Sequence, residues 1–309
     1  MKIVLLDTLT FGETDLSGFD AFGTVETYET TAPDETPGRI AGADIVVTNK
    51  VVITDRMMEA TPSLKLICVA ATGMNNVDLD AAEKRGIAVK NVAGYSTDSV
   101  VQHTFSMLFY LTGHSRYYDD YVKSGAWQRS PIFTHVGMPF HELRGKVWGI
   151  VGLGEIGRGV ARVAEAFGAT VRYYSTSGKN DNPDYEKVTL SRLLEESDVV
   201  SVHAPLNPAT QNLIGHSELL IMKDGAVLLN LGRGGIVDER ALAAILDAKP
   251  IYVGLDVLEK EPMSDPHPLT GVTHKERLYI TPHIAWTSVE ARERLIAAVI
   301  DNIRTFLNA

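Results

Sequence analysis

The sequence predicts an α/β protein built from two doubly wound parallel-sheet domains, the first of them discontinuous. Short apolar runs rich in Val and Ile alternate with segments of helical periodicity along the 309 residues. Because these runs are continuously apolar, they indicate strands buried on both faces of a parallel sheet. The alternating series occurs twice, and a chain of this length can form two separate cores.

The first series contains five candidate strands, with the sequences KIVLLD, TVETYE, DIVVTN, LKLICVA and IAVKNV. Segments such as DLDAAEKRG lie between them and favour helices that end at a glycine. The series lacks a closing helix, which the apolar stripe of the C-terminal segment would supply. Thr287 and Glu290 have the spacing of a capping box at its start. We therefore expect one domain over residues 1–98 and 287–309, and a second over 99–286.

The second series begins with a helical pattern. Apolar positions keep helical spacing from Val100 to Leu111, which predicts one long helix over residues 97–125. Residues 130–146 contain two prolines and no clear period, which indicates a loop. Six candidate strands follow, with the sequences KVWGIVG, ATVRYYS, SDVVSVHAP, GAVLLNL, IYVGLDV and LYITPH. Helical segments such as DERALAAILDA separate them, as expected for a second parallel sheet.

Composition excludes several classes of function. The net charge of −10 repels phosphate backbones, so we expect no nucleic-acid partner. The single cysteine, Cys68, lies in an apolar run and is expected to be a core residue. The apolar start before Asp7 is too short for a signal segment, and no run is long enough to span a membrane. We therefore expect a soluble cytoplasmic protein without a metal site, since no Cys or His cluster has ligand spacing.

A glycine motif opens the second series. Gly152, Gly154 and Gly157 form G-x-G-x-x-G directly after an apolar strand and directly before a helical pattern. Another strand follows at the distance of a βαβ unit. The glycines permit a tight turn and close approach of the backbone to a pyrophosphate, which the helix N-terminus attracts. The motif predicts a Rossmann-like dinucleotide site, and a structural turn without a ligand is the alternative.

The segment YSTSGK decides which dinucleotide is expected. NAD sites of this kind usually place an acid after the second strand, where it holds the ribose hydroxyls. Here Ser175 occupies that position, and residues 174–177 contain no acid. Ser175, Thr176, Ser177 and Lys179 can instead bind a 2′-phosphate. The alternative is a neutral turn that tolerates both cofactors. We expect NAD(H) or NADP(H), with a slight preference for NADP(H).

Three polar residues follow strands of the second sheet: Arg233, Glu261 and His283. Ligands of open α/β sheets bind at the carboxyl ends of the strands, so all three should face the dinucleotide crevice. Histidine can give a proton to a carbonyl that is being reduced, and a carboxylate can hold its ring and favour its charged form. Arginine offers a planar fork for a carboxylate or carbonyl. Each residue could instead be an ordinary surface or capping group.

Five longer sequence motifs, three of which contain Arg233, Glu261 and His283, point to a known family. The stretches ATGMNNVDLDAAEKRGIAVKNVAGYSTDSVVQHT, GIVGLGEIGRGVARVAEAFG, LLNLGRGGIVDERAL, GLDVLEKEP and TPHIAW occur in this order. With them the chain resembles the D-isomer-specific 2-hydroxyacid dehydrogenase family over nearly its whole length. The resemblance implies an NAD(P)-dependent dehydrogenase acting on CH–OH donors. It also implies a substrate-binding domain over 1–98 and 287–309, a dinucleotide-binding domain over 99–286, and homodimers formed through the latter.

The resemblance also implies roles for individual residues. Arg233 would orient the substrate, His283 would be the general acid/base, and Glu261 would be its partner. Backbone N–H groups of Gly73 and Met74 would hold the substrate carboxylate. Asp256 would lie near the nicotinamide amide. Beyond the glycines and the YSTSGK segment, the residues that match cofactor contacts of the family are Thr72, Glu155, Ile156, Ala204, Leu231, Gly232, Arg233, Asp256, His283 and Ala285.

The substrate class follows from two positions. Formate dehydrogenases carry glutamine where Glu261 stands, which disfavours that reaction. The sequence PHIAW, with Trp286 at the substrate, resembles glycerate dehydrogenases, which also act as hydroxypyruvate or glyoxylate reductases. We therefore expect hydroxypyruvate or glyoxylate, with D-glycerate in the other direction. A broader 2-keto acid reductase is one alternative. A non-catalytic dinucleotide-sensing protein is another, since such relatives keep the same three residues.

Overall fold

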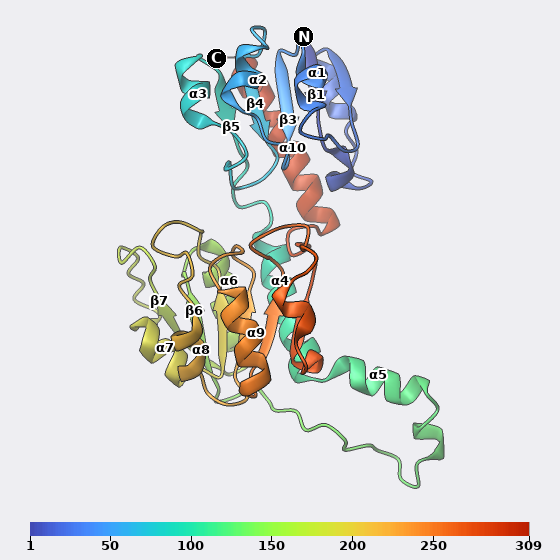
Figure 1. Ribbon diagram of the computed structural model, residues 1–309, viewed down its shortest axis with the longest axis vertical. Helices are drawn as coiled ribbons and strands as arrows, with labels where there is room; N and C mark the ends of the chain where they lie inside the picture. Colours follow the sequence, from blue (N-terminus) through green and yellow to red (C-terminus); the bar gives the residue numbers. More distant parts are fainter. Residues whose placement is uncertain (309) are drawn as a thin grey trace. The chain divides into compact units, whose positions relative to one another are not determined.

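The computed structural model describes residues 1–308, which form two compact units (Figure 1). One unit contains Met1–Ser96 and the chain from Trp286 onward, and the other contains Thr97–Ala285. Relative to the expected division, Thr97 and Asp98 belong to the second unit and Trp286 to the first. Each unit holds one parallel sheet between helices, so the predicted fold class is confirmed.

The first unit has a five-stranded sheet in the order β2-β1-β3-β4-β5. The strands are β1 (Lys2–Leu5), β2 (Thr24–Thr27), β3 (Ile45–Thr48), β4 (Leu66–Val69) and β5 (Ala88–Lys90). Successive residues of β1 and β3 enter different cores, because side chains alternate across a strand. The short helices α1 (Thr36–Ile40), α2 (Asp55–Glu59) and α3 (Leu79–Lys84) lie among the remaining connections, with the 3-10 helices η1 (Thr8–Phe11) and η2 (Ser17–Phe22).

The C-terminal helix α10 (Val289–Leu307) belongs to this unit, as the apolar stripe predicts. Leu295, Ile296, Val299 and Ile303 are buried against the face of the sheet that carries Ile3 and Leu5. The predicted capping box is wrong. The helix is capped by Ser288, whose hydroxyl accepts the N–H of Ala291 at 3.2 Å, so Glu290 stands one position too early to reach back.

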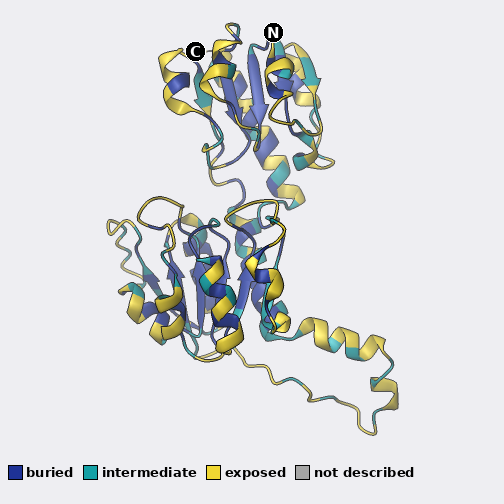
Figure 2. Ribbon diagram, in the orientation of Figure 1, coloured by how far each residue is buried: buried dark blue, intermediate teal, exposed yellow. Residues whose placement is uncertain are grey.

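The second unit has a seven-stranded parallel sheet in the order β12-β11-β10-β9-β6-β7-β8. The strands are β6 (Val147–Val151), β7 (Thr170–Tyr174), β8 (Glu186–Lys187), β9 (Val199–Val202), β10 (Val227–Asn230), β11 (Tyr252–Leu255) and β12 (Leu278–Ile280). Helices α4 (Thr97–Thr112) and α6 (Glu155–Ala166) cover one face. Helices α7 (Leu190–Glu196), α8 (His216–Ile221) and α9 (Glu239–Ala248) cover the other. Figure 2 shows the strands buried and the outer helix surfaces exposed.

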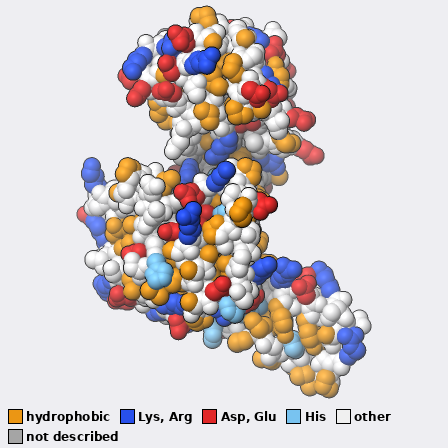
Figure 3. All heavy atoms as spheres, in the orientation of Figure 1, with side chains coloured by type: hydrophobic (Ala, Val, Ile, Leu, Met, Phe, Trp, Pro, Cys, Tyr) orange, Lys and Arg blue, Asp and Glu red, His pale blue; other side chains and the backbone are white. Residues whose placement is uncertain are grey.

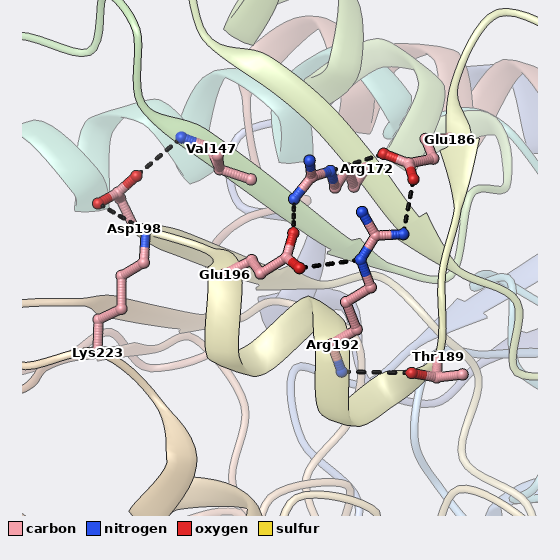
Figure 4. A network of polar contacts seen from close by, with 8 residues as sticks. All are labelled: Val147, Arg172, Glu186, Thr189, Arg192, Glu196, Asp198 and Lys223. Atoms are coloured by element: carbon pink, nitrogen blue, oxygen red, sulfur yellow. Dashed lines mark hydrogen bonds and ion pairs between the residues drawn. The ribbon is translucent and has the colours of Figure 1, made fainter.

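The polar strand β8 is missing from the predicted elements because it has no apolar run. It pairs with β7 through the backbone, and ion pairs reinforce this pairing (Figure 4). Arg172 of β7 donates to Glu186 of β8 at 2.8 Å and also pairs with Glu196 of α7. Arg192 bridges the same two carboxylates at 2.7 and 2.9 Å. The network therefore ties the edge of the sheet to the helix that follows it.

The predicted single helix over 97–125 is wrong, because it is interrupted at His114. This residue adopts a left-handed backbone, with φ of 49°, and its Nε2 contacts the Pro139 carbonyl oxygen at 3.0 Å. A second helix, α5 (Ser115–Lys123), follows the break. Figure 1 shows α5 and the segment after it extending away from the sheet of this unit. We call residues 115–142 the arm; apart from α5 it contains only the 3-10 helix η3 (Trp127–Arg129).

No helix within residues 1–308 is both long enough and apolar enough to cross a membrane. Cys68 is a buried free thiol on β4, and burial raises its pKa to about 12.

Candidate active site

The glycine turn follows β6, at the point where the chain first moves to β7 and later returns to β9 on the other side of β6. Gly152 has φ of 92°, a backbone that favours glycine, and a β-carbon here would press on the backbone of Ala204. A β-carbon at Gly157 would collide with the Gly152 carbonyl. Helix α6 begins at Glu155 with Gly154 as its N-cap and no side-chain cap, so its first N–H groups face the turn.

Residues after three neighbouring strands meet at this turn. Ala204 follows β9, and Leu231 and Gly232 follow β10. A β-carbon at Gly232 would lie 2.8 Å from the Ala204 carbonyl oxygen, so the backbones are in close contact. The structure thus brings together Gly152, Ala204 and Gly232, which sequence alone places far apart. Close backbone packing with uncapped helical N–H groups fits the pyrophosphate of a dinucleotide.

The YSTSGK segment is tied to the glycine turn by Asn180, which sequence reasoning missed. The hydroxyl of Ser175 is buried and accepts the Asn180 N–H at 3.2 Å. The Asn180 side chain donates to the Leu153 carbonyl oxygen at 2.6 Å. Thr176 is half-buried, whereas Ser177 and Lys179 are exposed. An asparagine in a loop signals a turn, but nothing in the sequence points to a partner 27 positions earlier.

His203, directly before Ala204, was also missed. Its two ring nitrogens are buried and have no hydrogen-bond partner among residues 1–308. Burial lowers the pKa of His203 to about 3, which keeps the ring neutral. A buried polar group without a partner is rare and is often satisfied by a ligand or a water.

Arg233 lies in the turn after β10, and Asn230 holds that turn. The Asn230 side chain donates to the Arg233 carbonyl oxygen at 2.9 Å and accepts the Gly232 N–H at 3.1 Å. The Arg233 guanidinium donates to the Gly232 carbonyl oxygen at 2.8 Å, and the residue is half-buried. The neighbouring Gly234 packs so closely that a β-carbon would collide with the Leu258 carbonyl. The turn that carries Arg233 therefore packs directly against the backbone of residues 258–259, just before Glu261.

Glu261 and His283 form a direct pair. Oε2 of Glu261 lies 2.6 Å from Nδ1 of His283, and Oε1 accepts the Leu258 N–H at 3.0 Å. The two side chains are 34% and 22% exposed, so the pair is accessible from outside the unit. Because a carboxylate only accepts hydrogen bonds, Nδ1 carries the proton in this pair. The neutral ring can then exchange a second proton at Nε2, as an acid/base group requires.

The backbone of His283 is strained, with a left-handed φ of 55°. Asp256, at the end of β11, holds it in place. The Asp256 carbonyl oxygen accepts the His283 N–H at 2.9 Å, and the carboxylate accepts the N–H groups of Ile284 and Ala285, each at 2.9 Å. The hydroxyl of Thr281 adds a bond of 2.6 Å. Asp256 thus fixes the backbone of residues 283–285 through hydrogen bonds and so holds His283 in its position.

His103 of α4 completes this cluster and was not predicted. Its Nε2 lies 3.1 Å from the Thr281 hydroxyl oxygen and 3.6 Å from Oδ1 of Asp256. Burial lowers the pKa of His103, and the charge of Asp256 acts in the opposite direction. A histidine within a helical pattern gives no sign that it meets a strand end 178 positions later.

The remaining expected residues belong to the first unit. Thr72, Gly73 and Met74 lie in the loop after β4, where the Thr72 hydroxyl donates to the Val92 carbonyl oxygen at 3.2 Å. Trp286 is half-buried, and its ring meets that of Tyr95 edge-on at 6.2 Å between centroids. Within residues 1–308, no three His, Cys, Asp or Glu side chains are grouped as metal ligands.

Comparison with known families and proteins gives consistent matches. A family model described as "D-isomer specific 2-hydroxyacid dehydrogenase, NAD binding domain" matches residues 105–285. The chain is 36% identical to a hydroxypyruvate reductase of Blautia hydrogenotrophica, over 99% of this chain and 97% of that protein. It is also 36% identical to a glycerate dehydrogenase of Methylorubrum extorquens, over 99% and 96%.

Solved structures agree over the same length. The TT0316 protein of Thermus thermophilus has a TM-score of 0.89 at 30% identity, covering 100% of this chain and 97% of its own. An acyclic imino acid reductase in complex with NADPH and D-Arg has a TM-score of 0.85 at 29% identity, covering 100% and 97%. A D-lactate dehydrogenase of Aquifex aeolicus with NAD and lactic acid has 0.83 at 26% identity, covering 100% and 96%.

Proposed function

Because the chain belongs to the D-isomer-specific 2-hydroxyacid dehydrogenase family, we propose that it reduces hydroxypyruvate or glyoxylate with a nicotinamide cofactor. D-Glycerate is the corresponding substrate in the oxidative direction. The observation that carries the proposal is the Glu261–His283 pair, which lies in the same unit as the glycine turn. Relatives with the names hydroxypyruvate reductase and glycerate dehydrogenase support the choice of substrate.

The cofactor's share of the chemistry is the hydride that passes to or from the 2-carbon of the acid. Its pyrophosphate fits the close backbone packing of Gly152, Ala204 and Gly232 and the open N-terminus of α6. We propose that the cofactor also contacts Thr72, Glu155, Ile156, Leu231 and Ala285. The carboxylate oxygens of Asp256 accept the N–H groups of Ile284 and Ala285 and the Thr281 hydroxyl, so its part is to shape the nicotinamide end of the site.

The chain's own residues supply the proton and the grip on the substrate. In reduction, Nε2 of His283 gives a proton to the carbonyl oxygen that becomes the hydroxyl group. Glu261 holds the ring at Nδ1 and stabilises the charge that the ring carries before the transfer. Arg233 binds the carboxylate or carbonyl with its planar fork. Backbone N–H groups of Gly73 and Met74 hold the carboxylate, and Trp286 contacts the substrate.

A steady-state screen tests this function. Hydroxypyruvate, glyoxylate, pyruvate and 2-ketoisocaproate are offered with NADH and with NADPH, and kcat/KM is measured for each pair. The proposal expects hydroxypyruvate or glyoxylate to give the highest value. Similar values for all four would indicate a broad 2-keto acid reductase. Binding of reduced cofactor without turnover of any of them would instead favour a dinucleotide-sensing protein.

We also propose that NADPH is used at least comparably to NADH, with a modest preference for NADPH. No acid stands at residues 175–179, and the exposed Ser177 and Lys179 can meet a 2′-phosphate. Ser175→Asp should move the enzyme toward NADH, because an aspartate accepts from ribose hydroxyls and repels the phosphate. Lys179→Ala is a second test and should lower kcat/KM with NADPH while leaving kcat/KM with NADH unchanged. A wild-type preference for NADH above roughly 100-fold, about 2.7 kcal/mol, contradicts the proposal.

A homodimer formed through the arm is part of the same proposal. Apolar side chains gather on it (Figure 3): Phe133 is 89% exposed, Val136 84% and Phe140 66%. A cavity of about 390 Å³ at its root is lined by Phe109, Phe140 and Phe167, among others. Apolar surface of this kind marks an interaction site. A second copy of the chain fits best, because dimers through the nucleotide domain are what the family resemblance implies.

Sedimentation velocity tests the dimer. The double variant Phe133→Asp with Val136→Asp should sediment as a monomer at concentrations where the wild type is a dimer, because two charges cannot be buried unpaired in an apolar interface. Leu9→Asp is the control, since Leu9 is 64% exposed in the first unit. A wild-type monomer, or an unchanged double variant, would show that the arm does not form the dimer.

The cytoplasm, where reduced nicotinamide cofactors are available, is the proposed location.

A further inference from the structure

A buried acid–imidazole pair lies outside the three proposed catalytic residues. Oε2 of Glu239, the first residue of α9, is 3.0 Å from Nε2 of His267, and their side chains are only 8% and 4% exposed. Burying a carboxylate is costly unless donors surround it. The proposed reaction uses neither residue, so the pair needs another explanation.

The neighbours of the pair fix the direction of each hydrogen bond. The Leu269 N–H donates to Nδ1 of His267 at 3.3 Å, so the ring proton is on Nε2 and points at Glu239. The other carboxylate oxygen, Oε1, accepts the Glu259 N–H at 2.6 Å. Both oxygens of Glu239 thus face donors. A glutamine would satisfy only one of them and would turn its own N–H groups toward the other.

The hydrogen bond between the Glu259 N–H and Oε1 of Glu239 connects the buried pair to the proposed active site. Glu259 lies within the turn over residues 258–261, which the Leu258 N–H closes by donating to Oε1 of Glu261 at 3.0 Å. Oε2 of the same carboxylate meets His283. Gly234, next to Arg233, packs against the backbone of Leu258 and Glu259. A shift of the Glu259 N–H would therefore move both the partner of His283 and the support of Arg233.

We propose that Glu239, held by His267, is a positioning residue that fixes the turn over residues 258–261 and so aims Glu261 at Nδ1 of His283. Glu239 acts only through this turn. The kinetic measurements below rest on the proposed function, whereas the spectroscopic measurement does not.

Glu239→Gln should lower kcat on the order of 10-fold, as loss of an orienting partner does, and leave the KM for the cofactor near wild type. A double-mutant cycle with Glu261→Gln identifies the route. If Glu239 acts through Glu261, the double variant should be no slower than Glu261→Gln alone. Two effects that multiply, or an unchanged kcat in Glu239→Gln, would overturn the proposal.

Two further variants separate positioning from general destabilisation. His267→Gln keeps an N–H donor toward Glu239 and should retain most activity, whereas His267→Leu removes the donor and should resemble Glu239→Gln. Glu218→Gln is the matched control, since Glu218 accepts the Gly215 N–H at 3.1 Å at the start of α8. Equal losses in His267→Gln and His267→Leu would overturn the proposal.

A spectroscopic readout works without turnover. The ring Hε1 signal of His283 is assigned in the NMR spectrum by its absence from His283→Gln. It should move in Glu239→Gln and in Glu261→Gln, and stay in place in Glu218→Gln. If no 2-keto acid is turned over, the proposed function fails, and this signal still tests the positioning role. An unmoved signal in a folded Glu239→Gln variant overturns it.

Discussion

Replacing His283 with alanine should lower kcat for keto-acid reduction on the order of 10²–10⁴-fold, the usual contribution of a general acid. Nε2 of His283 is the proposed proton donor, and its other nitrogen is committed to Glu261 at 2.6 Å. The glycine turn is built without this side chain, so the variant should still bind the reduced cofactor. Steady-state rates and a fluorescence titration with the reduced cofactor measure the two quantities.

The left-handed backbone of His283 calls for a control, because alanine tolerates that conformation poorly. Asn212 has φ of 50° in the same unit, and no role in the reaction is proposed for it. Asn212→Ala therefore shares the backbone change but not the chemistry. If His283→Ala reduces the keto acid within about twofold of wild type, His283 is not the proton donor. Equal losses in both variants would assign the effect to the backbone instead.

Local sequence pattern was sufficient for most of the fold. Strands such as β4 and β10 are continuous apolar runs, and burial on both faces requires such runs. The pattern failed where another force decides. β8 is polar and joins the sheet through its backbone pairing with β7 and through ion pairs, neither of which an apolar run signals. The helical period continues past Thr112, whereas the chain breaks the helix at Gly113 and His114, where His114 adopts a left-handed backbone. Ser288 replaces Thr287 as the cap of α10, a difference of one residue at a helix end.

In the candidate site too, some residues were predicted from the sequence and others were not. Glu261 and His283 were predicted as partners, because strand ends of one sheet converge and the family resemblance links these positions. The groups behind them were missed. His103 and His267 meet their partners across 178 and 28 positions, and each lies in an ordinary helical or loop context. Supporting contacts of this kind depend on three-dimensional packing, which one sequence does not reveal.

The second large effect concerns Arg233. Its turn is held from both sides, by Asn230 through two hydrogen bonds and by the close packing of Gly234 on Leu258. The side chain donates to the Gly232 carbonyl oxygen at 2.8 Å through Nη1 and is only half-buried. This arrangement fixes the base of the guanidinium and leaves its remaining donors for a carboxylate or carbonyl.

Arg233→Lys should therefore lower kcat/KM for the keto acid on the order of 10²-fold, about 2.7 kcal/mol, although the charge is kept. An ammonium group is a single point charge and cannot bind two oxygens in one plane. Arg240→Lys is the control, since Arg240 is exposed on the first turn of α9. The loss should appear in both kcat and KM, because the fork both binds and orients the substrate. If both constants stay near wild type in Arg233→Lys, another group holds the substrate carboxylate, and the proposed role of Arg233 is wrong.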